Sequence, residues 1–205
     1  DYTIDSITIN GAGYDYKGLF GYINNGEVKR LTCKVIIGNT GTIGGIVAKM
    51  CNGAQIRLCK VYGSIVSQSS YCGGIVGYNG GGVISLCENH ASINESLLSY
   101  NTGYTDNYYV GGIVGYMQPS ITDSGCVVNK CGNYSTIVGK NFVGGIVGMA
   151  SSCRDTISMC YNRGTIVANF SYGVGGTTAY VGGISGTGTS TENEKIEYCF
   201  NRGFL

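Results

Sequence analysis

Cysteine is the residue type of this chain with the widest range of chemistry, and ten of the 205 residues are cysteine. Five of them recur in one phrase, in which an aliphatic residue and two variable residues precede the thiol. These five are Cys59, Cys87, Cys131, Cys160 and Cys199. A small apolar side chain at one point of a repeat predicts a buried column, which we call the thiol ladder. The chain has one histidine and no C-x-x-C pair, so we predict no zinc, no other metal and no cofactor.

The remaining cysteines could form a disulfide. Cys126 and Cys153 occupy the turn before the thiol-ladder cysteine in two adjacent repeats. If the repeats stack as coils, equivalent residues of adjacent coils lie within the distance that a disulfide bridges. Cys126 and Cys153 are therefore the candidate disulfide pair, whereas parallel Cβ vectors within the thiol ladder would suit a disulfide badly.

Acid–base catalysis would have to use His90 or carboxylates such as Asp106, Asp123 and Asp155. His90 takes a position that arginine holds in later repeats, which predicts an exposed turn residue. A polysaccharide hydrolase or lyase needs two acids, or an acid and a base, that converge on one face. The three aspartates lie in irregular segments of neighbouring repeats, as solvated loop charges do. We therefore predict no catalytic residue and no enzyme activity.

Two insertions carry the residues that best fit a binding role. The segment from the thiol-ladder cysteine to the next glycine pair has 14–15 residues in regular repeats, 25 after Cys87 and 23 after Cys160. The predicted binding residues in them are Tyr100, Tyr104, Asp106, Asn107, Tyr108, Phe170 and Tyr172. Tyrosine beside asparagine and serine is typical of recognition loops, and aromatic rings also stack on sugars. The alternative is that both segments are tolerated insertions without a role.

The same insertions contain two N-x-S sequences, which are glycosylation acceptors only in a eukaryotic secretory setting. They begin at Asn94 and Asn169. A third begins at Asn133, which belongs to a column of asparagines and should be blocked if that column points inward.

A glycine phrase sets the period in which all these residues must be placed. Gly-Gly-Ile-Val-Gly is intact at residues 73–77, 111–115 and 144–148, with altered copies at 17–21, 44–48 and 182–186. Copies are 27 to 38 residues apart, a period typical of stacked repeats. Short apolar runs broken by Gly, Asn and Ser predict strands rather than helices. We therefore predict an all-β fold, a parallel β-solenoid (β-helix) of about six coils of about 28 residues, in a single domain over residues 1–205.

Because the glycine and cysteine phrases stay in phase, equivalent residues should form ladders from coil to coil. The expected aliphatic ladder is Leu19, Ile46, Ile75, Ile113, Ile146 and Ile184; the aromatic ladder is Tyr71, Tyr109, Phe142 and Tyr180; the asparagine ladder is Asn89, Asn133, Asn162 and Asn201. Neither end resembles a capping unit, so we expect the chain to be a piece of a longer repeat protein.

Gly18 to Gly21, with the residues that follow as far as Leu31, resembles the GLUG-motif repeat of bacterial-type surface and extracellular proteins. The resemblance extends over nearly the whole chain. It implies a surface or scaffold module, and the motif brings no catalytic residue with it. The thiol ladder departs from the usual pattern of such repeats.

Charge excludes some partners. Thirteen basic and twelve acidic residues leave a net charge of +1, with no basic stripe and no apolar run long enough to span a bilayer, so we predict neither nucleic-acid binding nor membrane insertion.

We predict an extracellular or cell-surface structural or adhesion module, whose partner is a carbohydrate or a cell-surface protein. The alternatives are a subunit that associates end to end into a filament and a carbohydrate-active β-helix enzyme.

Overall fold

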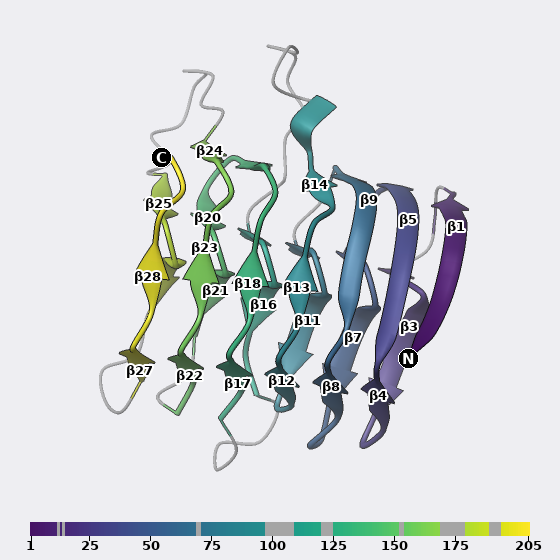
Figure 1. Ribbon diagram of the computed structural model, residues 1–205, viewed down its shortest axis with the longest axis horizontal. Coiled ribbons are helices and arrows are strands. Elements are labelled where there is room, and N and C mark those ends of the chain that lie inside the picture. Colours follow the sequence, from purple (N-terminus) through teal and green to yellow (C-terminus); the bar gives the residue numbers. More distant parts are fainter. Residues whose placement is uncertain are drawn as a thin grey trace.

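A computed structural model of the chain describes residues 1–11, 13, 15–68, 71–96, 109–119, 125–151, 154–168, 179–188 and 194–205. Its strands pair in parallel and build four sheets, so the prediction of an all-β parallel solenoid is confirmed. The coils stack side by side, and the N- and C-termini lie at opposite ends of the stack (Figure 1). No described segment forms a helix long and apolar enough to cross a membrane.

Each of the six coils visits the four sheets in the order B, C, D, A, and strand β1 adds one further strand to sheet A at the N-terminal end. Sheet B holds β2 (Tyr16–Lys17), β6 (Thr42–Gly44), β10 (Tyr71–Gly73), β15 (Tyr109–Gly111), β20 (Phe142–Gly144) and β25 (Tyr180–Gly182). Sheet C holds β3 (Phe20–Asn24), β7 (Val47–Cys51), β11 (Val76–Gly80), β16 (Val114–Met117), β21 (Val147–Ala150) and β26 (Ser185–Gly188).

Every strand of sheet D has three residues, and sheet A contains the most strands of the four sheets. Sheet D contains β4 (Glu27–Lys29), β8 (Gln55–Arg57), β12 (Val83–Ser85), β17 (Val127–Asn129), β22 (Thr156–Ser158) and β27 (Lys195–Glu197). Sheet A contains β1 (Tyr2–Asn10), β5 (Leu31–Asn39), β9 (Lys60–Ser67), β13 (Glu88–Asn89), β14 (Ser92–Ile93), β18 (Gly132–Asn133), β19 (Ile137–Gly139), β23 (Tyr161–Asn162), β24 (Ile166–Ala168) and β28 (Phe200–Asn201).

The glycine phrase makes the corner between sheets B and C. Its first glycine ends the strand of sheet B, and its valine begins the strand of sheet C. A Cβ on Gly73 would lie 1.9 Å from Val76 O, and a Cβ on Gly74 would lie 2.4 Å from Asn89 Cγ. Only glycine fits such close backbone approaches, and the second contact shows that the corner touches sheet A across a thin interior.

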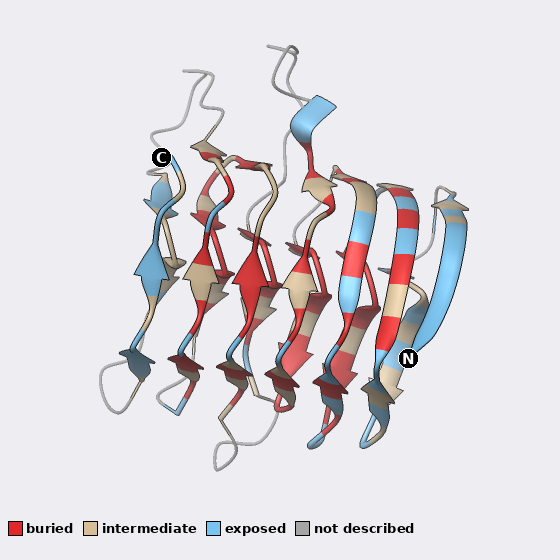
Figure 2. Cartoon of the chain, in the orientation of Figure 1, coloured by how far each residue is buried: buried red, intermediate tan, exposed pale blue. Residues whose placement is uncertain are grey.

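The predicted aliphatic, thiol and asparagine ladders fill that interior, whereas the aromatic ladder lies on the outer side of sheet B, and Figure 2 shows the buried residues concentrated in the middle coils. Ile46, Ile75, Ile113 and Ile146 are fully buried, as are all thiol-ladder cysteines except the half-buried Cys199. The aromatic ladder is also confirmed, because the ring centroids of successive members lie 5.4, 5.0 and 5.2 Å apart.

The asparagine ladder is confirmed as a continuous chain of side-chain hydrogen bonds. Asn89 Nδ2 donates to Asn133 Oδ1 at 2.9 Å, Asn133 to Asn162 at 2.8 Å and Asn162 to Asn201 at 2.7 Å. Each amide also bonds the backbone two residues further on, as Asn89 does with Ala91 N and O. The buried amides of this ladder are therefore satisfied by one another and by the backbone. Asn133 is fully buried, as predicted.

Candidate binding groove between sheets D and A

The corner between sheets D and A has an unusual backbone in every coil. The residue before the thiol-ladder position has a left-handed conformation, with φ between 52° and 56°. These residues, which we call the left-handed row, are Arg30, Leu58, Leu86, Lys130, Met159 and Tyr198. A positive φ is uncommon for any residue other than glycine and is strained for bulky ones, at about 1–3 kcal/mol each. Glycine would relieve that strain, yet none of the six positions is glycine.

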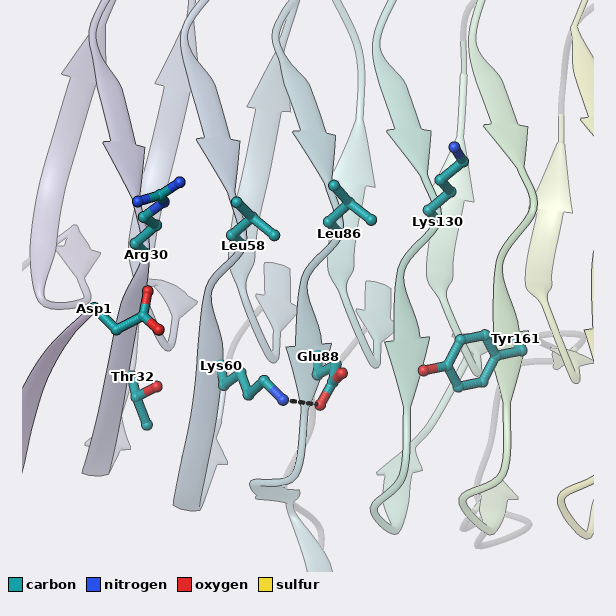
Figure 3. Close-up of a pocket in the computed structure, with 9 residues that line it drawn as sticks. All are labelled: Asp1, Arg30, Thr32, Leu58, Lys60, Leu86, Glu88, Lys130 and Tyr161. Carbon is teal, nitrogen blue, oxygen red and sulfur yellow. Dashed lines mark ion pairs between the residues drawn. The ribbon is translucent and has the colours of Figure 1, made fainter.

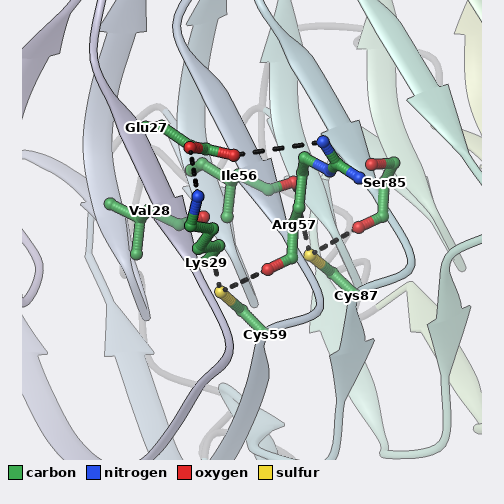
Figure 4. A network of polar contacts seen from close by, with 8 residues as sticks. All are labelled: Glu27, Val28, Lys29, Ile56, Arg57, Cys59, Ser85 and Cys87. Atoms are coloured by element: carbon green, nitrogen blue, oxygen red, sulfur yellow. Dashed lines mark hydrogen bonds and ion pairs between the residues drawn. The ribbon is translucent and has the colours of Figure 1, made fainter. Parts of the chain in front are cut away.

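Hydrogen bonds from both sides hold this corner. Leu58 N donates to Ser85 O of the next coil at 3.1 Å, and Leu86 N donates to Asn129 O at 3.0 Å. On the inner side, Cys59 Sγ lies 3.2 Å from Arg57 O, a contact that recurs in the later coils (Figure 4). The thiols therefore bond the carbonyls of the turn and also fill the core. The sequence analysis predicted only their burial.

Burial favours the neutral form of several of these cysteines. It raises the pKa of Cys33 to about 11 and that of Cys72 to about 12, and it also raises the pKa of Cys131, the central member of the thiol ladder. Cys126 is likewise a buried free thiol whose pKa is raised by burial, and its Sγ lies 3.2 Å from Asn79 O. The predicted disulfide between Cys126 and Cys153 stays a prediction, because Cys153 lies outside the described residues.

A groove of about 490 Å³ runs beside the left-handed row, parallel to the stack (Figure 3). We call it the corner groove. One wall comes from the left-handed row and the other from the outward side chains at the start of the sheet A strands. Its lining residues are Asp1, Arg30, Thr32, Leu58, Lys60, Leu86, Glu88, Lys130 and Tyr161.

The charges on the sheet A wall are paired with one another. Lys60 Nζ and His90 Nε2 each lie 3.0 Å from Glu88 Oε2. Partial burial opposes ionisation of Glu88, but the contacts with His90 and Lys60 outweigh it and lower the pKa of the carboxyl. The hydrogen bond to Glu88 raises the pKa of Lys60. This wall therefore presents a fixed ion pair at neutral pH rather than a free base.

The Tyr161 ring closes the end of the groove at the fifth coil. It can lie there because the paired residue of the fourth coil, Gly132, has no side chain. A Cβ on Gly132 would lie 2.4 Å from Tyr161 Cζ, so a side chain there would displace the ring. The Tyr161 hydroxyl is hydrogen-bonded to that of Tyr134, and burial together with this bond raises the pKa of Tyr161. The hydroxyl end of the ring thus points along the groove.

An aromatic column stands next to this wall. His90 stacks between Tyr62 and Tyr134, with both centroid distances 4.6 Å and interplanar angles of 8° and 4°. Both faces of His90 and one face of each tyrosine are therefore covered. The prediction that His90 is an exposed turn residue is therefore wrong: it is half-buried in this stack. Arg163 lies 5.9 Å from the Tyr134 ring centroid and 5.8 Å from that of Tyr161.

The predicted binding loops lie outside the described residues. This holds for Tyr100, Tyr104, Asp106, Asn107, Tyr108, Phe170 and Tyr172, and also for Cys153 and the acceptor Asn169. Asn94 is described and is 1% exposed, with Nδ2 donating to Val138 O at 3.0 Å and Oδ1 accepting from Ser67 N. Its expected glycosylation is therefore wrong for the folded chain, because the amide that would carry the glycan is buried and bonded.

Sequence reasoning missed the corner groove, although one signal was available. The residue before each thiol-ladder position is never glycine in a chain with 36 glycines, and in most coils it is large. Within the described parts of the chain, no three His, Cys, Asp or Glu side chains gather as a metal site. Asp155, one of the carboxylates considered for catalysis, is buried and accepts a hydrogen bond from Cys126 N at 2.9 Å.

No protein-family model matches this chain, and neither a curated protein nor a solved structure matches it.

Proposed function

We propose that this chain is a non-catalytic structural or adhesion module of an extracellular or cell-surface protein. One observation carries the proposal: inward ladders occupy the interior of successive coils, so that differences between coils appear on the outer surface and in the insertions. A stack of this kind is a stiff scaffold whose outer side chains recur at a fixed spacing. The resemblance to GLUG-motif repeats agrees with such a role.

The two insertions remain our predicted recognition loops, and the structure refines how to test them. β14 and Asn94 are part of the core, so a shortened variant must keep them and remove residues only between 97 and 107. In the second insertion, removal must fall between β24 and β25, within residues 169–178.

Adhesion is tested with beads that carry either the parent chain or the shortened variant. The beads are offered to cells and to surfaces coated with polysaccharides, and the solution is assayed for newly formed reducing ends. We expect the parent beads to attach and no reducing ends to appear. Release of reducing ends would contradict the non-catalytic role and favour the carbohydrate-active enzyme. Equal attachment by the shortened variant would show that the insertions do not bind. Filament assembly stays a prediction.

A further inference from the structure

We propose that the corner groove binds an extended acidic polysaccharide, with its carboxylate or sulfate groups held by the left-handed row. This inference rests on the proposed function, because it assumes that the outer surface of the solenoid attaches to a ligand. It assigns a ligand class and a site that do not include the insertions.

Two unpaired cations mark the length of the site. Arg30 in the first coil and Lys130 in the fourth both line the groove, and neither forms an ion pair with a residue that the structure describes. Three coil steps separate them, which corresponds to about 14 Å along the stack. Lys60, in contrast, already has Glu88 as its partner. The positive charges without an ion pair therefore lie towards the two ends of the groove, Arg30 with the Asp1 carboxylate near it and Lys130 without one among the lining residues, and they favour a ligand with repeated negative groups (Figure 3).

The stretch between these cations combines apolar and polar side chains in the way a sugar chain requires. Leu58 and Leu86 are 42% and 43% exposed and form the wall between Arg30 and Lys130 (Figure 3). Opposite them, the Thr32 and Tyr161 hydroxyls and the Glu88 carboxylate can exchange hydrogen bonds with ligand hydroxyls. A pyranose ring has apolar C–H faces and hydroxyl edges, and both kinds of wall are present.

A peptide fits this groove less well than a polysaccharide does. The backbone groups at the corner are bonded from coil to coil, as Leu58 N is to Ser85 O, so the walls present side chains and no open strand edge. A peptide lying along the stack would gain no main-chain pairing, which is the usual source of affinity for extended peptides on β-proteins. The hydroxyl and acidic groups of a polysaccharide, in contrast, pair with side chains.

The aromatic column argues for an acidic rather than a neutral polysaccharide. Neutral sugars bind mainly by lying on open ring faces, and in this column both faces of His90 and one face of each flanking tyrosine are covered. Charge is therefore the main attraction that the groove offers.

The test measures binding of the chain to immobilised alginate, heparin and dextran by biolayer interferometry, so that carboxylate, sulfate and neutral ligands are compared. We expect binding to alginate, to heparin or to both, weakening as salt screens the charges, and none to dextran. The double variant Arg30→Gln/Lys130→Gln should bind at least tenfold more weakly. The matched control Lys140→Gln/Lys195→Gln loses the same charge away from the groove and should bind like the parent.

A second variant removes the wall without changing charge. Asparagine tolerates the left-handed conformation, so Leu58→Asn/Leu86→Asn should keep the thermal unfolding midpoint within a few degrees while binding weakens severalfold. The inference is overturned if dextran binds equally, if both double variants bind like the parent, or if poly-glutamate competes as well as alginate, which would identify a peptide ligand. Attachment to cells without binding to either acidic polysaccharide overturns this inference alone. Failure to attach to any surface overturns the proposed function as well.

Discussion

The strand that each coil adds to sheet A is long and continuous in the first two coils but short or interrupted in the later ones. In the first two, β5 and β9 run unbroken for nine and eight residues. In the third, fourth and fifth coils, the equivalent stretch is divided into two short strands, such as β13 and β14, and the sixth coil has β28 (Phe200–Asn201) alone (Figure 1). At the point of division, Val61 of β9 pairs with Asn89 of β13.

The side chain at that position accounts for the difference. Asn89 bonds both Ala91 N and Ala91 O, at 3.1 and 3.0 Å, so these backbone groups leave the ladder and the strand bends. Val61 has no polar group, and the equivalent Gly63 pairs with Val35 within a continuous strand. One side chain therefore decides whether a coil has a straight or a bent side, while the thiol ladder and the corner groove continue through both kinds of coil.

The largest expected effect on the free energy of unfolding comes from a change in the thiol ladder, which runs through both the first two coils and the later ones. Cys131→Asp should lower the free energy of unfolding by about 4 kcal/mol or more, because it places an unpaired charge in a fully buried column. Burial would raise the pKa of the introduced carboxyl above its unfolded value. The penalty should therefore be complete above the folded-state pKa and shrink as the pH falls towards 4. Urea unfolding at pH 7 and pH 4.5 measures both.

Two further variants compare the halves of the molecule. Cys131→Val keeps the apolar volume and should cost less than about 1.5 kcal/mol. Cys59→Asp, in the second coil, should cost as much as Cys131→Asp because its thiol is equally buried. A much smaller penalty at Cys59 would show that the halves do not share one core.

An intermediate effect is expected for Asn133→Val, in the middle of the asparagine ladder. The change removes the bonds of Asn133 to Asn89, Asn162 and Ser135 and leaves buried amide groups unsatisfied. The cost should be about 3 kcal/mol, measured by urea unfolding. Asn129→Val is the matched control, since Asn129 is half-buried and its side-chain amide bonds Ser158 Oγ alone among the described residues. This variant should cost about 1 kcal/mol. Equal costs would mean that the ladder adds nothing beyond an ordinary hydrogen bond.

The smallest effect is expected for the reverse change, Val61→Asn. The new amide could donate to Asn89 Oδ1 and bond the backbone of Gly63, so the ladder would grow by one coil at a cost of about 1 kcal/mol. Hydrogen exchange should then show the bond between β9 and β5 at Gly63 weakened while the rest of sheet A keeps its protection. Unchanged exchange at Gly63 would disprove our explanation for the bend.

Much of the fold followed from the sequence because two phrases recur in phase. The glycine phrase predicted the period of the coils, and the cysteine and asparagine positions predicted the ladders. Repetition makes this possible: a residue that recurs once in each coil must have the same neighbours above and below it. The exposure of His90 and the use of Asn94 as a glycosylation acceptor were predicted wrongly, because each depends on which way one side chain points.

The sequence by itself determined the period, the register of the coils and the residues that fill the interior, since stacking of identical positions allows little else. The tertiary structure alone decided that Arg30 and Lys130 line one groove, that His90 is enclosed by two tyrosines, and that the left-handed row forms a wall. These features depend on backbone angles at a corner and on contacts between outward side chains. Neither leaves a periodic hydrophobic pattern in the sequence, because the solvent-facing side of a coil can carry almost any residue without disturbing the stack.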